Sequence, residues 1–476
     1  YVKAESDTGT ITAKNGADYL VNARAALHFL PSALRSAKDG ERIDDIWWAL
    51  YDWALLNGYD DSVHTIGAGL FYNSRAQALS KGLIESLFLK NKTLRGSVTL
   101  LEAYRKCPFA FFAKYGLKLK ERQEYDFAAP DLGTLVHAVL RCIGERLLEE
   151  GRPWRELKDD EILSLCTVET ERAAAEAANN ILMSDAYFRQ IKNRVVATLV
   201  RTVRQLRDFS EGSEFSVRAL EQPFGTKGAW KGLSFNLPDG VKVELVGQID
   251  RVDTLELDGR TFILIVDYKS GKKSITLPEV YSGLELQLFL YMAVARRNLG
   301  SKAVPAGAVY CRVRNDVQRC SAEPTAAEKE RAYIKAGQLS GFYLNDSDVV
   351  RALDDCTMEG RAASPYSGLK INNDGTLKKA ANVSDEAEWY RLLRLVEAAA
   401  CRSASELTSG CIDIYPARWG SSNEHKACDY CPYAALCRFD VTAEDGNSWN
   451  YLGNLSIDDL FPDTVIVKDG GQDGVD

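Results

Sequence analysis

The sequence lacks the features that mark several large classes of protein. It contains no run of about 18 or more apolar residues, the length that a membrane-spanning helix needs. It contains no G-x-x-x-x-G-K-[ST] phosphate loop either, so we expect no P-loop ATPase in this segment. Internal repeats are also missing. The composition that is present, with 46% hydrophobic and 26% charged residues, is typical of globular proteins.

The chain also lacks a net positive charge. Lys and Arg number 59 and Asp and Glu number 67, which gives a formal net charge of -8. The chain therefore has no overall basic field that would attract nucleic acid. Contact with DNA would have to come from local groups of basic residues, for which a solvated surface is the alternative interpretation. The candidate groups are Lys114, Lys118, Lys120 and Arg122, and Arg312 with Arg314.

A secretion signal is missing from the start of the sequence. The first residues, YVKAESDTGT, contain neither Met nor a charged segment followed by an apolar one, and we expect a fragment of a longer protein. The sequence nevertheless contains 11 cysteines. Without an export signal we expect a cytoplasmic location and no disulfide framework, so any clustered cysteines need another explanation.

Hydrophobic spacing divides the chain into three parts. Residues 1–95 show apolar spacing near 3.6 and are predicted to be mostly helical. Residues 96–440 are predicted to form an α/β domain, followed at 441–476 by an extension with an acidic, glycine-rich tail. Within the α/β domain we expect a helix capped by Ser97 or Thr99, further helices at 131–150, 283–299 and 385–402, and strands at 241–257, 260–270 and 306–313.

One predicted hairpin brings two carboxylates together. Asp258-Gly259 is a favoured two-residue turn between strands. If these residues form the turn, opposing positions have residue numbers that sum to 517, and Asp250 lies opposite Asp267. Opposing side chains have Cβ atoms roughly 4.5–5.5 Å apart, where two like charges destabilise a sheet unless a cation separates them. Mg²⁺ prefers oxygen ligands and would resolve the conflict.

A lysine accompanies this pair. Lys269 stands two residues after Asp267 and therefore on the same face of its strand, where an ammonium group can orient water or stabilise developing charge. The preceding residues 263–266 are all apolar, as in strands buried on both faces, and a charge at the end of such a strand is costly without a role. The alternative is a structural ion pair between Asp267 and Lys269, with Asp250 unrelated.

Three other residues are weaker candidates by themselves. His137 lies within the helix predicted at 131–150, where a packed core histidine is the alternative to a metal ligand. Gln287 and Tyr291 are four residues apart and share one face of the helix predicted at 283–299.

Together these residues resemble the RecB-type PD-(D/E)XK nucleases. The matching motifs are His137 in GTLVHAVL, Asp250 in GQIDR, Asp267 and Lys269 in VDYKS, and Gln287 with Tyr291 in QLFLY. The resemblance implies a restriction-endonuclease-like core with helical elaborations. It implies a site for Mg²⁺, or Mn²⁺, made by His137, Asp250, Asp267 and the backbone carbonyl of Tyr268. Lys269 would assist catalysis, and Gln287 and Tyr291 would position the DNA strand.

Four of the cysteines form a separate pattern. Cys428, Cys431 and Cys437 in CDYCPYAALC follow a C-x2-C-x5-C spacing that indicates a metal. The fourth ligand has to come from elsewhere, and Cys107 in RKCPFAFF, 321 residues before Cys428, is the natural candidate. Four thiolates suit zinc and an iron–sulfur cluster equally, and closing so long a loop would restrict the unfolded chain. A zinc knuckle that contacts DNA by itself is the alternative.

The order of all these motifs resembles the nuclease domain of the AddB subunits of bacterial AddAB helicase–nucleases. The resemblance runs from SVTLLEAYRKCPF to CDYCPYAALCRFD. It implies that the four cysteines hold a [4Fe–4S] cluster as a structural staple and that residues 1–95 are the remnant of a helicase-like region. It also implies a DNA exonuclease that degrades the 5′-ended strand during double-strand break repair by homologous recombination, partnered by an AddA-type motor subunit.

Two other functions fit the same motifs. One is a non-catalytic iron–sulfur module that binds DNA or assembles a complex. Intact His137, Asp250, Asp267 and Lys269 disfavour it, because an inactive nuclease would be free to lose them. The other is a stand-alone RecB-type exonuclease, which the long helical region before residue 95 disfavours.

Overall fold

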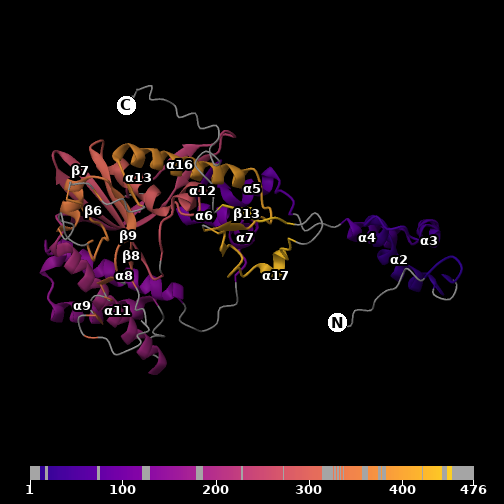
Figure 1. Ribbon diagram of the computed structural model, residues 1–476, viewed down its shortest axis with the longest axis horizontal. Helices are drawn as coiled ribbons and strands as arrows, with labels where there is room; N and C mark the ends of the chain where they lie inside the picture. Colours follow the sequence, from indigo (N-terminus) through magenta and orange to yellow (C-terminus); the bar gives the residue numbers. More distant parts are fainter. Residues whose placement is uncertain are drawn as a thin grey trace. The chain divides into compact units, whose positions relative to one another are not determined.

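Residue contacts in the computed structural model divide the chain between Arg75 and Ala76. The smaller unit contains residues 1–75 and 439–447, and the larger unit contains residues 76–438 and 448–476 (Figure 1). The structure describes residues 11–16, 20–71, 76–120, 129–177, 186–226, 229–271, 273–313, 325, 328–329, 332, 334–335, 337–355, 363–373, 377, 382–420, 422–441 and 447–452.

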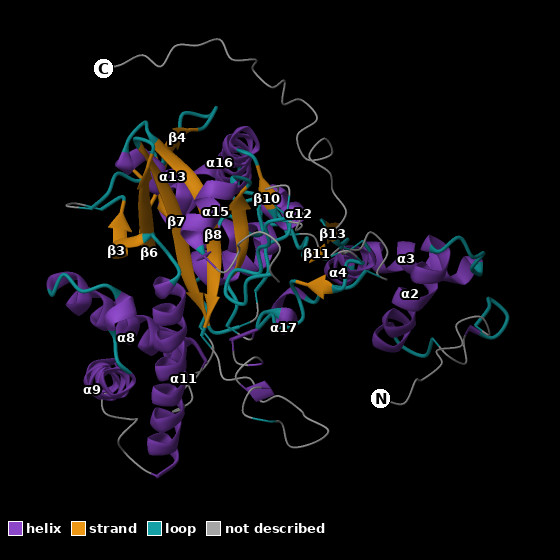
Figure 2. Ribbon diagram, turned by 60° about the vertical axis from the view of Figure 1, so that its left-hand side comes forward, coloured by secondary structure: helices purple, strands orange, loops and turns teal. Residues whose placement is uncertain are grey.

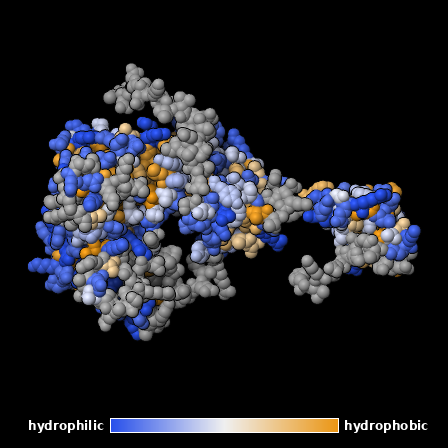
Figure 3. All heavy atoms as spheres, in the orientation of Figure 1, coloured by the Kyte–Doolittle hydropathy of each residue, from blue (hydrophilic) through white to orange (hydrophobic). Residues whose placement is uncertain are grey.

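The smaller unit is built from helices. Its helices are α2 (Ala23–Lys38), α3 (Asp45–Leu56) and α4 (Asp60–Leu70). Leu30 and Trp47 form its small core, with exposed fractions of 0% and 1%. Hydrophobic residues also reach its surface (Figure 3), where Trp48 and Trp53 are 47% and 40% exposed. Of the tryptophans on α3, only Trp47 is therefore buried by packing within this unit.

The segment that follows Arg75 belongs to the larger unit because it pairs with that unit's strands. It contains α5 (Lys81–Phe88), β1 (Leu89–Lys90) and β2 (Thr93–Gly96). β2 pairs in parallel with β5 (Lys242–Leu245). The structural division thus precedes α5, whereas the sequence predicted a boundary near residue 95. The helical spacing of α5 matches that of the earlier helices, and nothing local reveals that the next strand pairs with a distant one.

A six-stranded sheet forms the centre of the larger unit, with the order β10-β9-β8-β7-β6-β3. β6 and β7 form an antiparallel hairpin, and β7 and β8 run parallel. Nearly every residue of β7 and β8 is buried, as expected for strands covered on both faces. The predicted α/β class is confirmed. The strands are β3 (Ser216–Phe224), β6 (Gly247–Leu257), β7 (Arg260–Lys269), β8 (Ala303–Arg312), β9 (Ser340–Leu344) and β10 (Val383–Ser384).

Helices lie on both sides of this sheet. α13 (Gln287–Leu299) and α16 (Glu386–Thr408) pack on one side, where α13 contacts β7 and β8 (Figure 1). The group of α8 (Ala129–Glu149), α9 (Asp159–Ala177) and α11 (Ala186–Glu211) lies on the other side, and α8 contacts β3 (Figure 2). None of the described helices is both long and apolar enough to cross a membrane.

Shorter elements complete the larger unit. Ser97 caps α6 by accepting a hydrogen bond from the Leu100 N–H at 3.2 Å, as predicted. The remaining elements are α6 (Val98–Lys106), α7 (Pro108–Phe111), a π-helical turn (Phe112–Gly116), a 3₁₀ turn (Trp154–Glu156), β4 (Ser234–Asn236), α12 (Leu277–Ser282), α15 (Ser347–Leu353), β11 (Ala417–Trp419), β12 (His425–Lys426), α17 (Ala434–Cys437) and β13 (Asn450–Tyr451).

The strand predicted at 241–257 is two strands in two different sheets. β5 belongs to a four-stranded sheet with the order β1-β2-β5-β4, and the chain enters the six-stranded sheet after Val246. A Cβ atom at Gly247 would lie 2.8 Å from the buried ring of Phe224, so the crossing point requires glycine. Apolar residues on both sides of Val246 concealed this change of sheet in the sequence.

Candidate active site

The β6–β7 hairpin sets the geometry of the site. Asp258 and Gly259 form its two-residue turn with φ of 51° and 73°, as a type I′ turn requires. Every β6–β7 pair, from Leu257↔Arg260 to Arg251↔Val266, has residue numbers that sum to 517, which confirms the predicted register. The regular pairing ends one residue before Asp250 and Asp267, which lie within β6 and β7 and close enough for their charges to interact.

Backbone and side-chain groups hold the two aspartates in place. Asp250 Oδ2 accepts a hydrogen bond of 2.8 Å from the Tyr268 N–H. Asp267 is fully buried, and its Oδ1 accepts a hydrogen bond of 2.9 Å from Gln287 Nε2. Asp267 Oδ2 lies 2.5 Å from Lys269 Nζ and receives no other hydrogen bond among the described residues. This buried oxygen therefore retains capacity for a further ligand.

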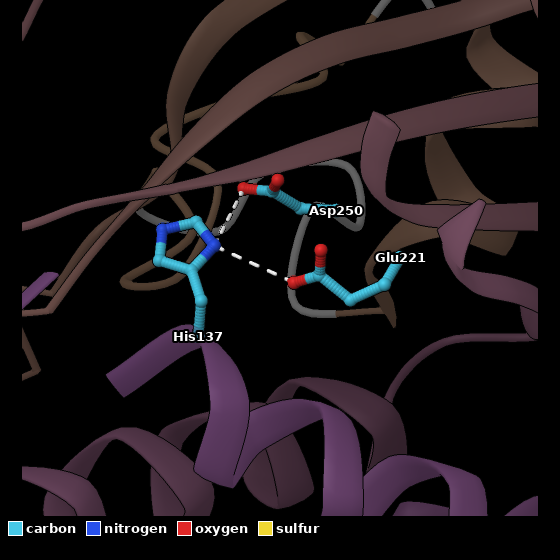
Figure 4. Close-up of side chains that lie close together, drawn as sticks. All are labelled: His137, Glu221 and Asp250. Carbon is cyan, nitrogen blue, oxygen red and sulfur yellow. Dashed lines mark ion pairs between the residues drawn. The ribbon is translucent and has the colours of Figure 1, made fainter. Parts of the chain in front are cut away.

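A third carboxylate, Glu221, joins His137 and Asp250 (Figure 4). The potential ligand atoms of these three residues lie within 4.8 Å of one another. His137 Nδ1 is 3.5 Å from Glu221 Oε1 and 3.4 Å from Asp250 Oδ2. His137 comes from α8, Glu221 from β3 and Asp250 from β6, so the group forms only when α8 packs against the sheet. Asp267 is not a member of this group.

The second ring nitrogen of His137 fixes which atom faces the carboxylates. Nε2 lies 3.1 Å from the backbone carbonyl of Tyr268. A carbonyl can only accept, so Nε2 carries the proton and a neutral ring presents the lone pair of Nδ1 to Glu221 and Asp250. A lone pair facing two carboxylates needs a proton or a cation between them. A histidine that donates one N–H to a carbonyl and offers the other nitrogen is the usual arrangement of a metal ligand.

Burial and charge repulsion together shift the pKa values of the site. Burial, and next the charge of Asp267, raises the pKa of Asp250 to about 7. Burial also raises the pKa of Asp267, although Lys269 opposes this effect. Burial lowers the pKa of His137, but Glu221 and Asp250 outweigh it and raise the value above the ordinary one. A divalent cation would relieve these strains because it favours ionised carboxylates and a neutral imidazole.

Lys269, Gln287 and Tyr291 form one connected group. Lys269 Nζ donates to Gln287 Oε1 at 3.1 Å, and Gln287 Nε2 donates to Tyr291 Oη at 3.1 Å as well as to Asp267. Gln287 is partly exposed, whereas Tyr291 is buried. Gln287 is therefore accessible at the surface, and the hydroxyl of Tyr291 orients its amide. The predicted partnership of these residues on one face of α13 is confirmed.

Glu102 lies behind this group. It is buried on α6, and its Oε1 accepts hydrogen bonds from the N–H groups of Leu286 and Gln287 at 2.7 Å and 3.0 Å. These are the backbone groups at the start of α13, which has no cap from its own side chains. Burial, and next the charge of Glu285, raises the pKa of Glu102 to about 7.

Neither Glu102 nor Glu221 was predicted from the sequence. A signal for Glu102 exists, because it shares the apolar face of α6 with Val98 and Leu101, where a glutamate is unexpected. Glu221 offers no such signal. It follows a bulge between Val217 and Ala219 and has a φ of 43°, so the strand bends locally and simple alternation does not predict its direction.

The predicted cysteine ligands lie near enough to one another for their charges to interact. Burial, and next the charges of Cys107, Cys431 and Cys437, raises the pKa of Cys428 to about 12. Burial at the start of α7 raises the pKa of Cys107 to about 11, although hydrogen bonds from the backbone N–H groups of Ala110 and Phe109 oppose this effect. The charges of Cys107 and Cys428 therefore influence each other although the two residues are 321 positions apart in the sequence.

The predicted basic groups are only partly described. Arg122 and Arg314 lie outside the described residues. Lys114, Lys118 and Lys120 follow α7 and are exposed, and Lys114 lies over the Tyr115 ring.

The comparison with protein families defines the class to which this fold and site belong. Residues 95–438 match the model of the PD-(D/E)XK nuclease superfamily, and the chain belongs to this superfamily. Residues 12–63, in the smaller unit, match the model of the fifth domain of the ATP-dependent helicase/deoxyribonuclease AddB.

Curated relatives carry a matching name. A protein of Desulforudis audaxviator, named as the B subunit of an ATP-dependent helicase/deoxyribonuclease, is 34% identical over 94% of this chain and 38% of its own length. Proteins of the same name from Bacillus thuringiensis and Bacillus anthracis are 34% and 33% identical over 90% of this chain and 36% of their own length. The resemblance to AddB subunits is confirmed, and the chain spans somewhat more than a third of the length of these relatives.

Proposed function

We propose that this chain carries a Mg²⁺-dependent deoxyribonuclease. The observation that carries the proposal is the lone pair of His137 Nδ1, directed at Glu221 and Asp250 beside a buried pair of aspartates. The nitrogen and oxygen donors of His137, Glu221 and Asp250 lie within 4.8 Å of one another and fit a hard divalent cation. Such a cation polarises a phosphate and lowers the pKa of bound water.

The residues around this position have separate roles. Lys269 supplies a positive charge, held in position by Asp267 and Gln287, that can stabilise negative charge on the attacked phosphate. Gln287 holds both Asp267 and Lys269 and can contact the DNA strand, while Tyr291 acts through Gln287. His137 fixes its own orientation through the Tyr268 carbonyl.

We propose further that Cys107, Cys428, Cys431 and Cys437 hold a [4Fe–4S] cluster. The donor set supports this, since cysteine thiols become stable thiolates when a metal cluster binds them, and the pKa of Cys428 is raised by burial and next by the charges of the other three cysteines. The cluster would join the segment after α6 to the segment around α17 and serve as a staple of the nuclease domain.

The names of the relatives suggest the wider process. We infer that the chain acts in a helicase–nuclease of the AddAB type, with an AddA-type motor subunit, and degrades the 5′-ended strand during recombinational repair of double-strand breaks. The motor would supply single-stranded DNA, because no phosphate loop occurs in the present sequence.

Cleavage of end-labelled DNA tests the nuclease proposal. Single strands labelled at the 5′ or the 3′ end should be cut in Mg²⁺ and remain intact in EDTA. The same assay on a duplex with the motor subunit should show shortening of the 5′-ended strand. Binding of single strands without cleavage in any divalent cation would instead support a non-catalytic DNA-binding module. Full processive activity on duplexes without a motor subunit would support a stand-alone exonuclease.

A further inference from the structure

The carboxylate of Glu102 links the start of α13 to α6, the helix that directly precedes Cys107. Glu102 Oε1 accepts hydrogen bonds from both Leu286 N and Gln287 N, at 2.7 Å and 3.0 Å. Gln287 is the first residue of α13, and its side chain holds Asp267 and Lys269. The position of the Gln287 backbone therefore determines where these two catalytic candidates are held.

The helix that carries Glu102 is itself fixed at several points. Arg105 Nε donates to the Ser282 carbonyl at the end of α12 at 2.8 Å, and Tyr104 Oη donates to the Cys411 carbonyl at 3.1 Å. The same helix ends at Cys107. α6 is thus held by the C-terminal segment on one side and holds α13 on the other.

Carboxylates are favourable at helix N-termini because they accept from free N–H groups and oppose the positive end of the helix dipole. Here the carboxylate comes from a different helix, 184 and 185 positions away from its two partners, so it fixes tertiary position as well as capping. The side chain is buried, so water cannot replace it as an acceptor.

We propose that Glu102 is a positioning residue of the nuclease, which holds Gln287 in register with Asp267 and Lys269 and so couples α6 to the active site. This inference rests on the proposed nuclease function. Glu102 acts through the backbone of Gln287, to which it is hydrogen-bonded, and not through contact with DNA or with the proposed metal ligands. The carbonyl oxygen of a glutamine at this position could accept the same two hydrogen bonds.

The test compares Glu102→Ala and Glu102→Gln in Mg²⁺-dependent cleavage of labelled single strands by the full chain. Glu102→Ala should lower kcat about 10- to 100-fold, the range expected for a small displacement of catalytic groups, with KM within about twofold. Glu102→Gln should restore kcat to within about threefold of the wild type. Tyr104→Phe is the matched control, because it removes one hydrogen bond of α6 and leaves those between Glu102 and the start of α13 in place, so its kcat should stay within about twofold of the wild type.

A double-mutant cycle identifies the route of the effect. If Glu102 acts through Gln287, the variant Glu102→Ala with Gln287→Ala should be no slower than Gln287→Ala alone. Additive losses, or an unchanged kcat in Glu102→Ala, would overturn the inference. A kcat loss in Tyr104→Phe equal to that in Glu102→Ala would also overturn it, because general loosening would then explain both. A wild-type protein without cleavage would instead contradict the proposed function itself.

Discussion

The Tyr268 N–H donates a hydrogen bond of 2.8 Å to Asp250 Oδ2, so the residue between Asp267 and Lys269 is tied to the opposite strand by a side chain. At this point the sheet ladder between β6 and β7 has ended, and the carboxylate takes the place of a backbone acceptor. Tyr268 meanwhile offers its carbonyl to His137. The backbone of one residue on β7 thus orients side chains from two other elements, Asp250 on β6 and His137 on α8.

Replacement of the catalytic candidates on β7 should separate cleavage from folding. Asp267→Asn and Lys269→Ala should each abolish measurable cleavage in Mg²⁺, a loss of at least about 1,000-fold, because they remove groups that face the cation and the phosphate. Binding of single strands, measured by fluorescence anisotropy, should change little. Lys242→Ala, which removes a surface ion pair with Glu244, is the control. Near-wild-type cleavage in either β7 variant would show that the active site has been misassigned.

Glu221 should contribute to metal binding. Mg²⁺ binds only the folded site and should stabilise the wild type by about 2.7 kcal/mol at 100 times its Kd, which appears as a rise in melting temperature. Glu221→Gln removes one charged donor from the group formed with His137 and Asp250, so this rise should shrink and the apparent Kd should increase. Glu256→Gln alters an exposed carboxylate on β6 and should leave the rise intact. Equal shifts in all three proteins would exclude Glu221 as a ligand.

The four cysteines should behave as one unit. Protein purified without oxygen should be brown and contain iron, and replacing Cys107, Cys428, Cys431 or Cys437 with Ala should cause similar losses of iron, thermal stability and DNA binding. Cys142→Ala should keep its iron, because Cys142 lies on α8 and contacts Arg172. Full iron in Cys107→Ala would place the fourth ligand elsewhere. Stoichiometric zinc in natively expressed protein would change the identity of the metal and leave the nuclease proposal in place.

The buried carboxyl group of Glu102 should make stability depend on pH. Burial, and next Glu285, raises its pKa from 4.5 to about 7, so the folded protein retains a proton that the unfolded chain releases. The free energy of unfolding should therefore fall as pH rises from about 4.5 to about 7, by at most about 3 kcal/mol from this group, and then level off. The measurement is urea unfolding at several pH values without divalent cations. Glu102→Gln should lack this fall in the free energy of unfolding, whereas Glu85→Gln, which changes an exposed residue, should retain it. Identical slopes in wild type and Glu102→Gln would refute the prediction.

The sequence predicted the part of the site that depends on local geometry. The turn at Asp258-Gly259 determines the pairing of β6 with β7, so the approach of Asp250 and Asp267 followed from counting residues. Likewise, the helical spacing of four placed Tyr291 beside Gln287. In both cases the prediction needed only the regular geometry of one helix, or of two strands joined by a short turn.

The features that were not predicted depend on packing between distant elements. Glu221 reaches His137 only because a bulge turns β3 and because α8 lies against that strand. The capping of α13 by Glu102 joins two helices that are separated in sequence by three of the six strands of the central sheet. The boundary at Arg75 depends on the parallel pairing of β2 with β5. None of these contacts leaves a periodic pattern along the chain.

The anchoring of α6 also has a consequence for the order of events during synthesis. The Tyr104 hydroxyl and the Phe109 N–H find their partners in the carbonyls of Cys411 and Asp413, which follow β10, the last strand of the central sheet along the chain, by 27 and 29 residues. Domains generally fold from the N-terminus as they emerge. The last contacts that hold α6, the helix whose Glu102 caps α13, can therefore form only after every strand of the central sheet has been synthesised.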